Sequence, residues 1–277
     1  MVTVFHMMVV PKKNLVFLNQ IPIFFYNRFI FKLNNIDIHE MKERVCCTNY
    51  SDYYLEIETN CLPNYKIQLD SYEPRNMLDF KIPTEVSLDP TGFWGPYNLI
   101  KKNFLPLGPI GVCINGVPFF SQETRNNYSI PNINYFYNQL PLDVSVFSNE
   151  DTFSDLNQLF RHQLENQEHS QIIGFSFDGF PIYGPIGWDS DKKVKIMSSS
   201  YQDKEYIDDF GDLDICNGVF SPTPDYPKGI YHYHASIKKG EDGFPELHQG
   251  QVISVYPHVI ARYRGTPEIR NFIEPSD

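Results

Sequence analysis

The sequence predicts a mainly β fold: a single sandwich-like or barrel-like domain with one short α-helix. The chain of 277 residues contains 22 phenylalanines and 18 tyrosines but only two alanines. Alanine is the best helix former, whereas aromatic residues favour strands. The 21 prolines and 16 glycines supply the turns that connect short strands. A genome rich in A and T would also deplete alanine, so codon usage explains part of this bias.

Composition and charge narrow the class of protein. A chain with 42% hydrophobic and 21% charged residues is typical of proteins that fold and bury a core. The formal net charge of −11 argues against nucleic acid as a partner, because binding a phosphate backbone requires a basic surface. The five cysteines are an odd number and form no CxxC pair, so no disulfide framework and no cysteine-type metal cluster is predicted.

Residues 1–44 are expected to form an N-terminal extension, either as added strands or as a lead-in with little order, before a β-rich domain over residues 45–277. Polar and charged residues interrupt the apolar ones in this segment. No stretch therefore approaches the roughly 18 to 20 apolar residues of a membrane-spanning helix. The charged start, apolar region and small-residue cleavage site of a secretion signal are not visible either.

Short strands are predicted from Val45 to Ile82, where apolar and polar residues alternate and turn signals occur at residues 62–64 and 72–74. Prolines and glycines recur over residues 83–109, which indicates a long loop around Phe93 and Trp94.

A helix is predicted from Phe153 to about Glu168, beginning at a capping box formed by Thr152 and Asp155. The apolar residues of one face are Phe153, Leu156, Leu159, Phe160 and Leu164. His162 and His169 lie off this face, so we expect both to be exposed to solvent.

An internal repeat organises the central part of the chain. Residues 111–120 read GVCINGVPFF and residues 174–183 read GFSFDGFPIY, so each segment runs from an apolar strand into an Asn-Gly or Asp-Gly turn followed by proline. Downstream, INYFYN at residues 133–138 matches GIYHYH at residues 229–234. We therefore predict a pseudo-duplicated domain with half-repeats at about 105–141 and 171–236, of which only the second keeps its histidines.

The histidines of the second copy are the strongest indication of chemistry. In an extended strand, His232 and His234 point to one face, while Tyr231 and Tyr233 point to the other. Two imidazoles on one face can bind one ion, and imidazole is a ligand for zinc, copper, iron and nickel. The alternative is structural, with the tyrosines packed inward and the histidines hydrogen-bonded on a wetter face.

A metal site needs further ligands from elsewhere in the chain. Asp178 lies at the Asp-Gly turn, and Asp214 and Cys216 lie in the segment DLDICNG. We take His232, His234, Asp178 and Asp214 as the candidate ligands of a divalent transition metal such as zinc or copper. Cys216, Tyr231, Tyr233 and His258 are additional candidates.

Three segments in order, GFSFDGFPIYGPIG, LDICNGVFSPTPDYPKGIYHYHAS and YPHVIARYRG, resemble the YHYH-domain proteins. The resemblance runs from about Leu55 to Gly265. It implies an exported or extracellular protein. Because activity in this family is largely uncharacterised, the resemblance supports the fold and the site more than a function.

The chain departs from the family pattern in its first copy. The family's first YHYH strand corresponds to Tyr135-Phe136-Tyr137-Asn138, in which both histidines are replaced, and Tyr65 stands where an early family histidine is expected. If the family site needs histidines from both copies, part of it is lost here. If the second copy suffices, Asp178, His232 and His234 remain.

Three classes of function fit these observations. The first is a protein that binds a transition metal through the His-x-His strand. The second is a metal-dependent hydrolase, in which an open coordination position activates water and Asp178 or Asp214 acts as the base. The third is a degenerate scaffold that interacts with another protein. The sequence favours no particular partner or substrate.

Overall fold

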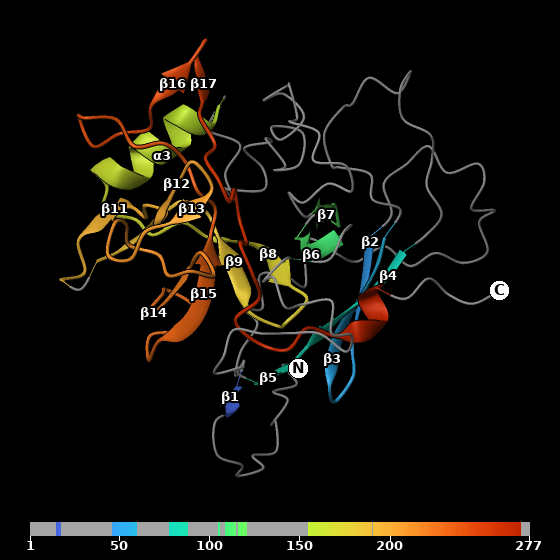
Figure 1. Ribbon diagram of the computed structural model, residues 1–277. Coiled ribbons are helices and arrows are strands. Elements are labelled where there is room, and N and C mark those ends of the chain that lie inside the picture. The colour runs from blue at the N-terminus through green and yellow to red at the C-terminus, as the bar shows by residue number, and fades with distance from the viewer. Residues whose placement is uncertain are drawn as a thin grey trace, which may run out of the picture.

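The computed structural model describes residues 15–17, 46–59, 78–87, 105, 109–114, 116–120, 155–189 and 191–272 (Figure 1). Strands dominate this part of the chain, and it contains a single α-helix, so the predicted mainly β class is confirmed. No helix within these ranges is long and apolar enough to cross a membrane.

The central element is a six-stranded sheet with the strand order β14-β15-β9-β8-β6-β7. Its strands are β6 (Pro109–Cys113), β7 (Pro118–Phe120), β8 (Ile172–Ser176), β9 (Pro181–Tyr183), β14 (Gly218–Ser221) and β15 (Ile230–His234). Neighbouring strands are antiparallel except for β15 and β9, which pair in parallel through Tyr233 and Ile182. This parallel pairing places the histidine strand beside the hairpin that contains the Asp-Gly turn.

The two sequence segments GVCINGVPFF and GFSFDGFPIY each form a hairpin of this sheet, β6–β7 and β8–β9. The turn glycines Gly116 and Gly179 have φ angles of 84° and 92°, a backbone conformation that residues other than glycine rarely adopt. The hairpins pair with each other through β6 and β8. The second part of the first half-repeat, residues 133–138, lies outside the described residues, so the duplication stays a prediction.

A three-stranded antiparallel sheet, β2-β3-β4, lies beside the central sheet (Figure 1). Its strands β2 (Cys46–Tyr50), β3 (Tyr54–Thr59) and β4 (Leu78–Pro83) are the strands predicted for residues 45–82, whereas the predicted turns at 62–64 and 72–74 lie outside the described residues. Within the loop predicted for residues 83–109, β5 (Glu85–Ser87) forms a strand by pairing with β1 (Leu15–Phe17). Backbone hydrogen bonds to another strand can order a short segment whose sequence has no clear pattern of its own. Phe93 and Trp94 are outside the described residues.

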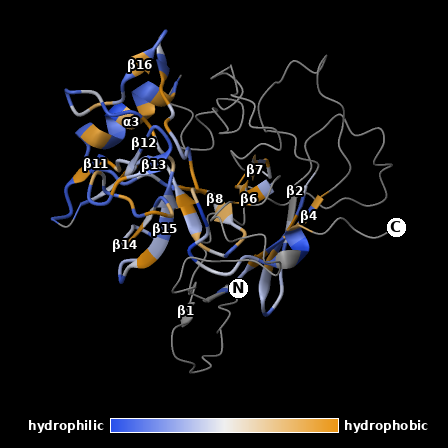
Figure 2. Cartoon of the chain, in the orientation of Figure 1, coloured by the Kyte–Doolittle hydropathy of each residue, from blue (hydrophilic) through white to orange (hydrophobic). Residues whose placement is uncertain are grey.

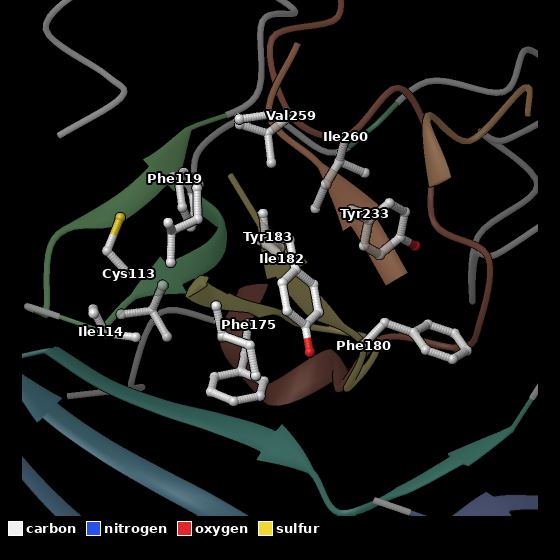
Figure 3. Close-up of a cluster of buried hydrophobic side chains, with 14 of the residues drawn as sticks. Cys113, Ile114, Phe119, Phe175, Phe180, Ile182, Tyr183, Tyr233, Val259 and Ile260 are labelled. Carbon is white, nitrogen blue, oxygen red and sulfur yellow. The ribbon is translucent and has the colours of Figure 1, made fainter. Parts of the chain in front are cut away.

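One hydrophobic core joins the two sheets. Its side chains come from β3 and β4, from the central sheet and from the segment near residue 260. The rings of Phe80 on β4 and Phe177 beside the Asp-Gly turn lie 5.2 Å apart and connect the two sheets directly. Figure 3 shows the part of this core around Phe175, Tyr183 and Tyr233. The aromatic-rich composition is therefore used to fill the space between strands.

The helix α3 (Leu156–Glu165) is shorter than predicted. Asp155 is its N-cap, and the carboxylate of Asp155 accepts a hydrogen bond from the amide of Gln158 at 2.8 Å. Leu159 and Phe160 are buried, as the predicted apolar face requires. Figure 2 shows that α3 carries both hydrophobic and hydrophilic residues. Thr152 and Phe153 lie outside the described residues.

The two histidines next to this helix differ in their environment. The side chain of His162 is 45% exposed, as predicted, but His169 is only 7% exposed, so the prediction that His169 faces solvent is wrong. The helix ends at Glu165, and the chain then turns inward, with the amide of Ser170 donating to the carbonyl of Ile186. Because His169 lies beyond the helix, the helical pattern does not determine its direction.

The rest of the described chain forms short hairpins around the central sheet (Figure 1). They are β10 (Ile186–Trp188) with β11 (Val194–Ile196), β12 (Tyr201–Gln202) with β13 (Glu205–Tyr206), and β16 (Leu247–His248) with β17 (Gln251–Val252). A 3-10 helix, η5 (Ile269–Phe272), follows near the end. The β10–β11 hairpin matters for the site because it follows directly after β9 and lies against His169 and His234.

Candidate metal centre

Strand β15 places two imidazoles on one face and two phenols on the other. His232 and His234 are both fully buried, and their Nε2 atoms lie 3.1 Å apart. The hydroxyls of Tyr231 and Tyr233 instead contact the carboxylates of Asp214 and Asp178. The alternation of a strand thus separates a face rich in imidazole nitrogen from a face rich in tyrosine and carboxylate.

His169 forms a group of three histidines with His232 and His234, which we call the triad. One ring nitrogen of each lies within 4.8 Å of the corresponding nitrogens of the other two. The centroid of the His169 ring is 6.2 Å from that of His232 and 5.7 Å from that of His234. The group therefore draws on β15 and on the segment between α3 and β8, which are about sixty residues apart in the sequence.

The hydrogen bonds of the Nδ1 atoms fix the tautomers of these three rings. Nδ1 of His169 lies 2.6 Å from the carbonyl oxygen of Ser170, Nδ1 of His232 lies 2.9 Å from that of Ile230, and Nδ1 of His234 lies 2.7 Å from that of Gly184. A carbonyl oxygen can only accept a hydrogen bond, so each Nδ1 carries the proton. In a neutral ring, the Nε2 atom is then unprotonated and carries a lone pair.

Burial keeps all three rings neutral. It lowers the pKa of His169 to about 4 and that of His232 to about 3, and it places the pKa of His234 well below the ordinary value. The short contact between Nε2 of His232 and Nε2 of His234 consequently joins two lone pairs and is not a hydrogen bond. Among the described residues, Nε2 of His169 has no hydrogen-bond partner.

The metal-free protein is expected to lose stability as the pH falls below about 6.5. Unfolding releases the histidines to their ordinary pKa of about 6.5, so below that pH the unfolded chain binds protons that the folded chain does not. Each of the three rings then lowers the free energy of unfolding by up to about 1.4 kcal/mol per pH unit, until the pH reaches the folded pKa. Urea unfolding of chelator-treated protein at pH 7.5 and 5.5 measures this loss.

The variant His169→Phe is the control for this pH dependence. It keeps an aromatic ring but removes one titrating group, so its loss of stability between the two pH values should be smaller than that of the unmodified protein. Equal losses in the two proteins would show that His169 does not contribute to the effect. His258 titrates in the same range, because burial lowers its pKa to about 4, and it is present in both proteins.

Apolar and aromatic groups surround the triad. The ring of Tyr183 lies 5.0 Å from the rings of both His169 and His232, and the ring of Trp188 lies 5.1 Å from that of His169. The hydroxyl of Tyr183 donates to Asp225 Oδ2 at 2.9 Å and lies 2.9 Å from Thr223 Oγ1. Tyr183 thus supports the imidazoles with its ring while its polar atom is bound elsewhere.

Gly187 on β10 allows a close approach behind His234. A Cβ atom at this position would lie 3.0 Å from Cε1 of His234 and 2.5 Å from Cγ of Met197. Only glycine leaves enough space for both side chains. The backbone of β10 therefore helps to hold the orientation of the His234 ring, in addition to the hydrogen bond from its Nδ1 to Gly184.

The two aspartates named from the sequence lie on the tyrosine face of β15. Asp178 Oδ2 accepts hydrogen bonds from the hydroxyl of Tyr233 at 2.7 Å and from the amides of Gly265 and Arg264 at 2.9 and 3.1 Å. Asp178 also accepts a hydrogen bond from Ser176 Oγ. Asp214 accepts from the hydroxyl of Tyr231 at 2.9 Å and from the amides of Cys216 and Gly218. The structure brings neither carboxylate into the histidine group.

The additional candidates are also placed away from the triad. The thiol of Cys216 points to the carbonyl of Tyr263 at 3.7 Å, and burial raises its pKa to about 12. His258 Nδ1 lies 2.8 Å from Ser254 Oγ. Tyr231 and Tyr233 face away from the imidazole nitrogens. Within the described residues, His232 and His234 are thus joined by His169, which the sequence reasoning assigned to the surface.

The ligand set that results is three neutral imidazole nitrogens. Such a set suits zinc, copper, nickel or iron. The carbonyl groups on the Nδ1 side correspond to the outer contacts that usually orient metal-bound histidines.

Comparison with known proteins gives one match. A family model described as YHYH protein matches residues 96–240, which is more than half of the chain and includes all three histidines. No curated protein and no solved structure matches the chain.

Proposed function

The chain belongs to the YHYH protein family. From the geometry of its buried histidines we propose that it binds a divalent transition metal through His169, His232 and His234. The observation that supports this most strongly is the convergence of three buried imidazoles, each of which has an unprotonated Nε2 atom. The Nδ1 atom of each ring donates a hydrogen bond to a backbone carbonyl. No ring can therefore move its proton to Nε2, which would relieve the repulsion between the lone pairs, without losing that hydrogen bond.

Without a cation, this arrangement is unfavourable. Two lone pairs face each other at 3.1 Å, and a third buried nitrogen lacks a hydrogen-bond donor among the described residues. An unsatisfied buried polar atom costs about 1–3 kcal/mol. A metal ion satisfies all three nitrogens at once. If the histidines had a purely structural role, tautomers in which one ring donates a hydrogen bond to the next would be more stable. The geometry therefore favours metal binding.

Metal content of protein purified without a histidine tag tests this proposal. Elemental analysis should find close to one zinc or copper ion per chain in the unmodified protein and background levels in the double variant His232→Ala/His234→Ala. The control is His162→Ala/His248→Ala, which removes two exposed histidines and should keep the metal.

A second measurement keeps the test valid if the double variant does not fold. Unmodified protein is freed of metal with a chelator, titrated with Zn²⁺ and Cu²⁺, and followed by competition with a coloured chelator. Binding of one ion per chain supports the proposal. Background metal after purification, together with no binding in the titration, would overturn it and leave the scaffold class of function.

A further inference from the structure

We infer that the metal held by the three histidines keeps one coordination position free for a small anion or a water molecule. This inference rests on the proposed function, because it concerns the ion at the same three nitrogens. It adds a ligand that the protein does not supply and gives that ligand a chemical class.

The donor atoms near the triad are the first support for an open position. Among the described residues, no carboxylate or thiol joins the three nitrogens to form a larger group. The hydroxyl of Tyr183, whose ring contacts two of the histidines, is engaged with Asp225 and Thr223. The indole of Trp188 offers no lone pair to a metal. Zinc in proteins binds four ligands, and sites with three protein ligands complete the set with water or substrate.

Charge is the second support. All three ligands are neutral, so a divalent ion brings two positive charges into a site whose imidazoles are buried and which is walled by the rings of Tyr183 and Trp188. An uncompensated charge in such surroundings is costly. The carboxylates of Asp178 and Asp214, which could balance it, are bound to tyrosines on the other face of β15. A small anion on the metal reduces the net charge directly.

Burial limits the size of this ligand. His232 and His234 are fully buried, and Nε2 of His169 is also shielded from solvent. The side of the triad next to His169 is the more accessible one, because His169 is 7% exposed and its neighbour Trp188 is partly exposed. A ligand of two or three heavy atoms, such as azide or cyanate, fits these limits better than an aromatic acid.

An open position would also give the metal a chemical role. A zinc ion held by the three histidines would lower the pKa of a bound water molecule and could so supply a nucleophile for hydrolysis or hydration. The reacting group would then be small and would enter beside His169. Asp178 and Asp214 do not face this position, so neither is placed to act as the base there.

Cobalt substitution with an anion titration tests the open position. The full chain is freed of metal, loaded with Co²⁺, and its visible absorption is recorded while sodium azide is added. We expect saturable changes in the absorption bands with azide and no change with benzoate at the same ionic strength. His162→Ala, which alters an exposed histidine, should respond as the unmodified protein does.

The possible failures of this experiment can be told apart. If Co²⁺ does not bind, the proposed function itself fails. If Co²⁺ binds but azide leaves the bands unchanged, a ligand from the protein closes the site and the inference is wrong. Met197, whose thioether packs against Gly187 next to His234 Cε1, is the side chain to replace in that case, by Met197→Leu, because a Cβ atom at Gly187 would lie 2.8 Å from its sulfur and 3.0 Å from His234 Cε1. An equal response to benzoate would contradict the small size of the site.

Discussion

Replacing His169 with phenylalanine is expected to lower the affinity of the protein for Zn²⁺ about a hundredfold or more. The substitution removes one of three nitrogen ligands but keeps an aromatic ring between Tyr183 and Trp188. Zinc binding by a protein site contributes on the order of 10 kcal/mol, so the loss of one ligand in three corresponds to about 3 kcal/mol. Competition with a coloured chelator at pH 7.5 measures the change.

His162→Phe is the matched control for this experiment. It introduces the same residue seven positions earlier in the chain, on α3, at a side chain that is 45% exposed. We expect its zinc affinity to equal that of the unmodified protein. If His169→Phe also bound zinc with unchanged affinity, His169 would not be a ligand, and the site would reduce to the His-x-His pair on β15.

Replacing Asp178 with alanine is expected to destabilise the protein by about 3 to 5 kcal/mol. This fully buried carboxylate accepts hydrogen bonds from Ser176, Tyr233, Arg264 and Gly265. Its removal leaves several buried donors without an acceptor, each at a cost of about 1–3 kcal/mol. It also releases the segment at residues 264–265 from the Asp-Gly turn. Urea unfolding at pH 7.5 measures the loss.

The variants Asp178→Asn and Tyr233→Phe separate this structural role from metal binding. Asparagine keeps an acceptor oxygen for the three donors at Oδ2. Phenylalanine removes one donor to Asp178 and one acceptor for the amide of Arg264, which keeps its hydrogen bond to Asp178, so each variant should cost less than Asp178→Ala. We expect both variants, once folded, to bind zinc as tightly as the unmodified protein. A large fall in zinc affinity for Asp178→Asn would contradict the assignment of Asp178 to the tyrosine face.

Several strands of the two sheets were foreseeable from the sequence, although the order in which they pair was not. The two Asn/Asp-Gly-x-Pro segments have a local signature because glycine readily adopts the positive φ of a tight turn and proline is tolerated as the first residue of a strand. Both segments form hairpins, and β2, β3 and β4 appear where apolar and polar residues alternate. The strand β5 was missed, since its three residues gain their structure from pairing with β1 and carry no pattern of their own.

The histidine pair was also foreseeable, because the two-residue period of a strand is a local property. The alternation on β15 directs His232 and His234 to one side without any knowledge of the tertiary structure. The third histidine of the triad, His169, could not be foreseen in this way. His169 follows the end of α3, where the chain leaves the helix and turns inward to Ile186, and no periodic pattern describes such a segment.

The sequence by itself determined the local conformations: the strands, the two tight turns and the direction of each side chain along β15. These depend on steric preferences within a few residues. The tertiary structure decided which polar side chains meet, because this depends on the parallel pairing of β15 with β9 and on the path of the chain after α3. That pairing sets Asp178 against Tyr233 and leaves the opposite face of β15 to His169, so three histidine nitrogens come together and the aspartates lie on the other side.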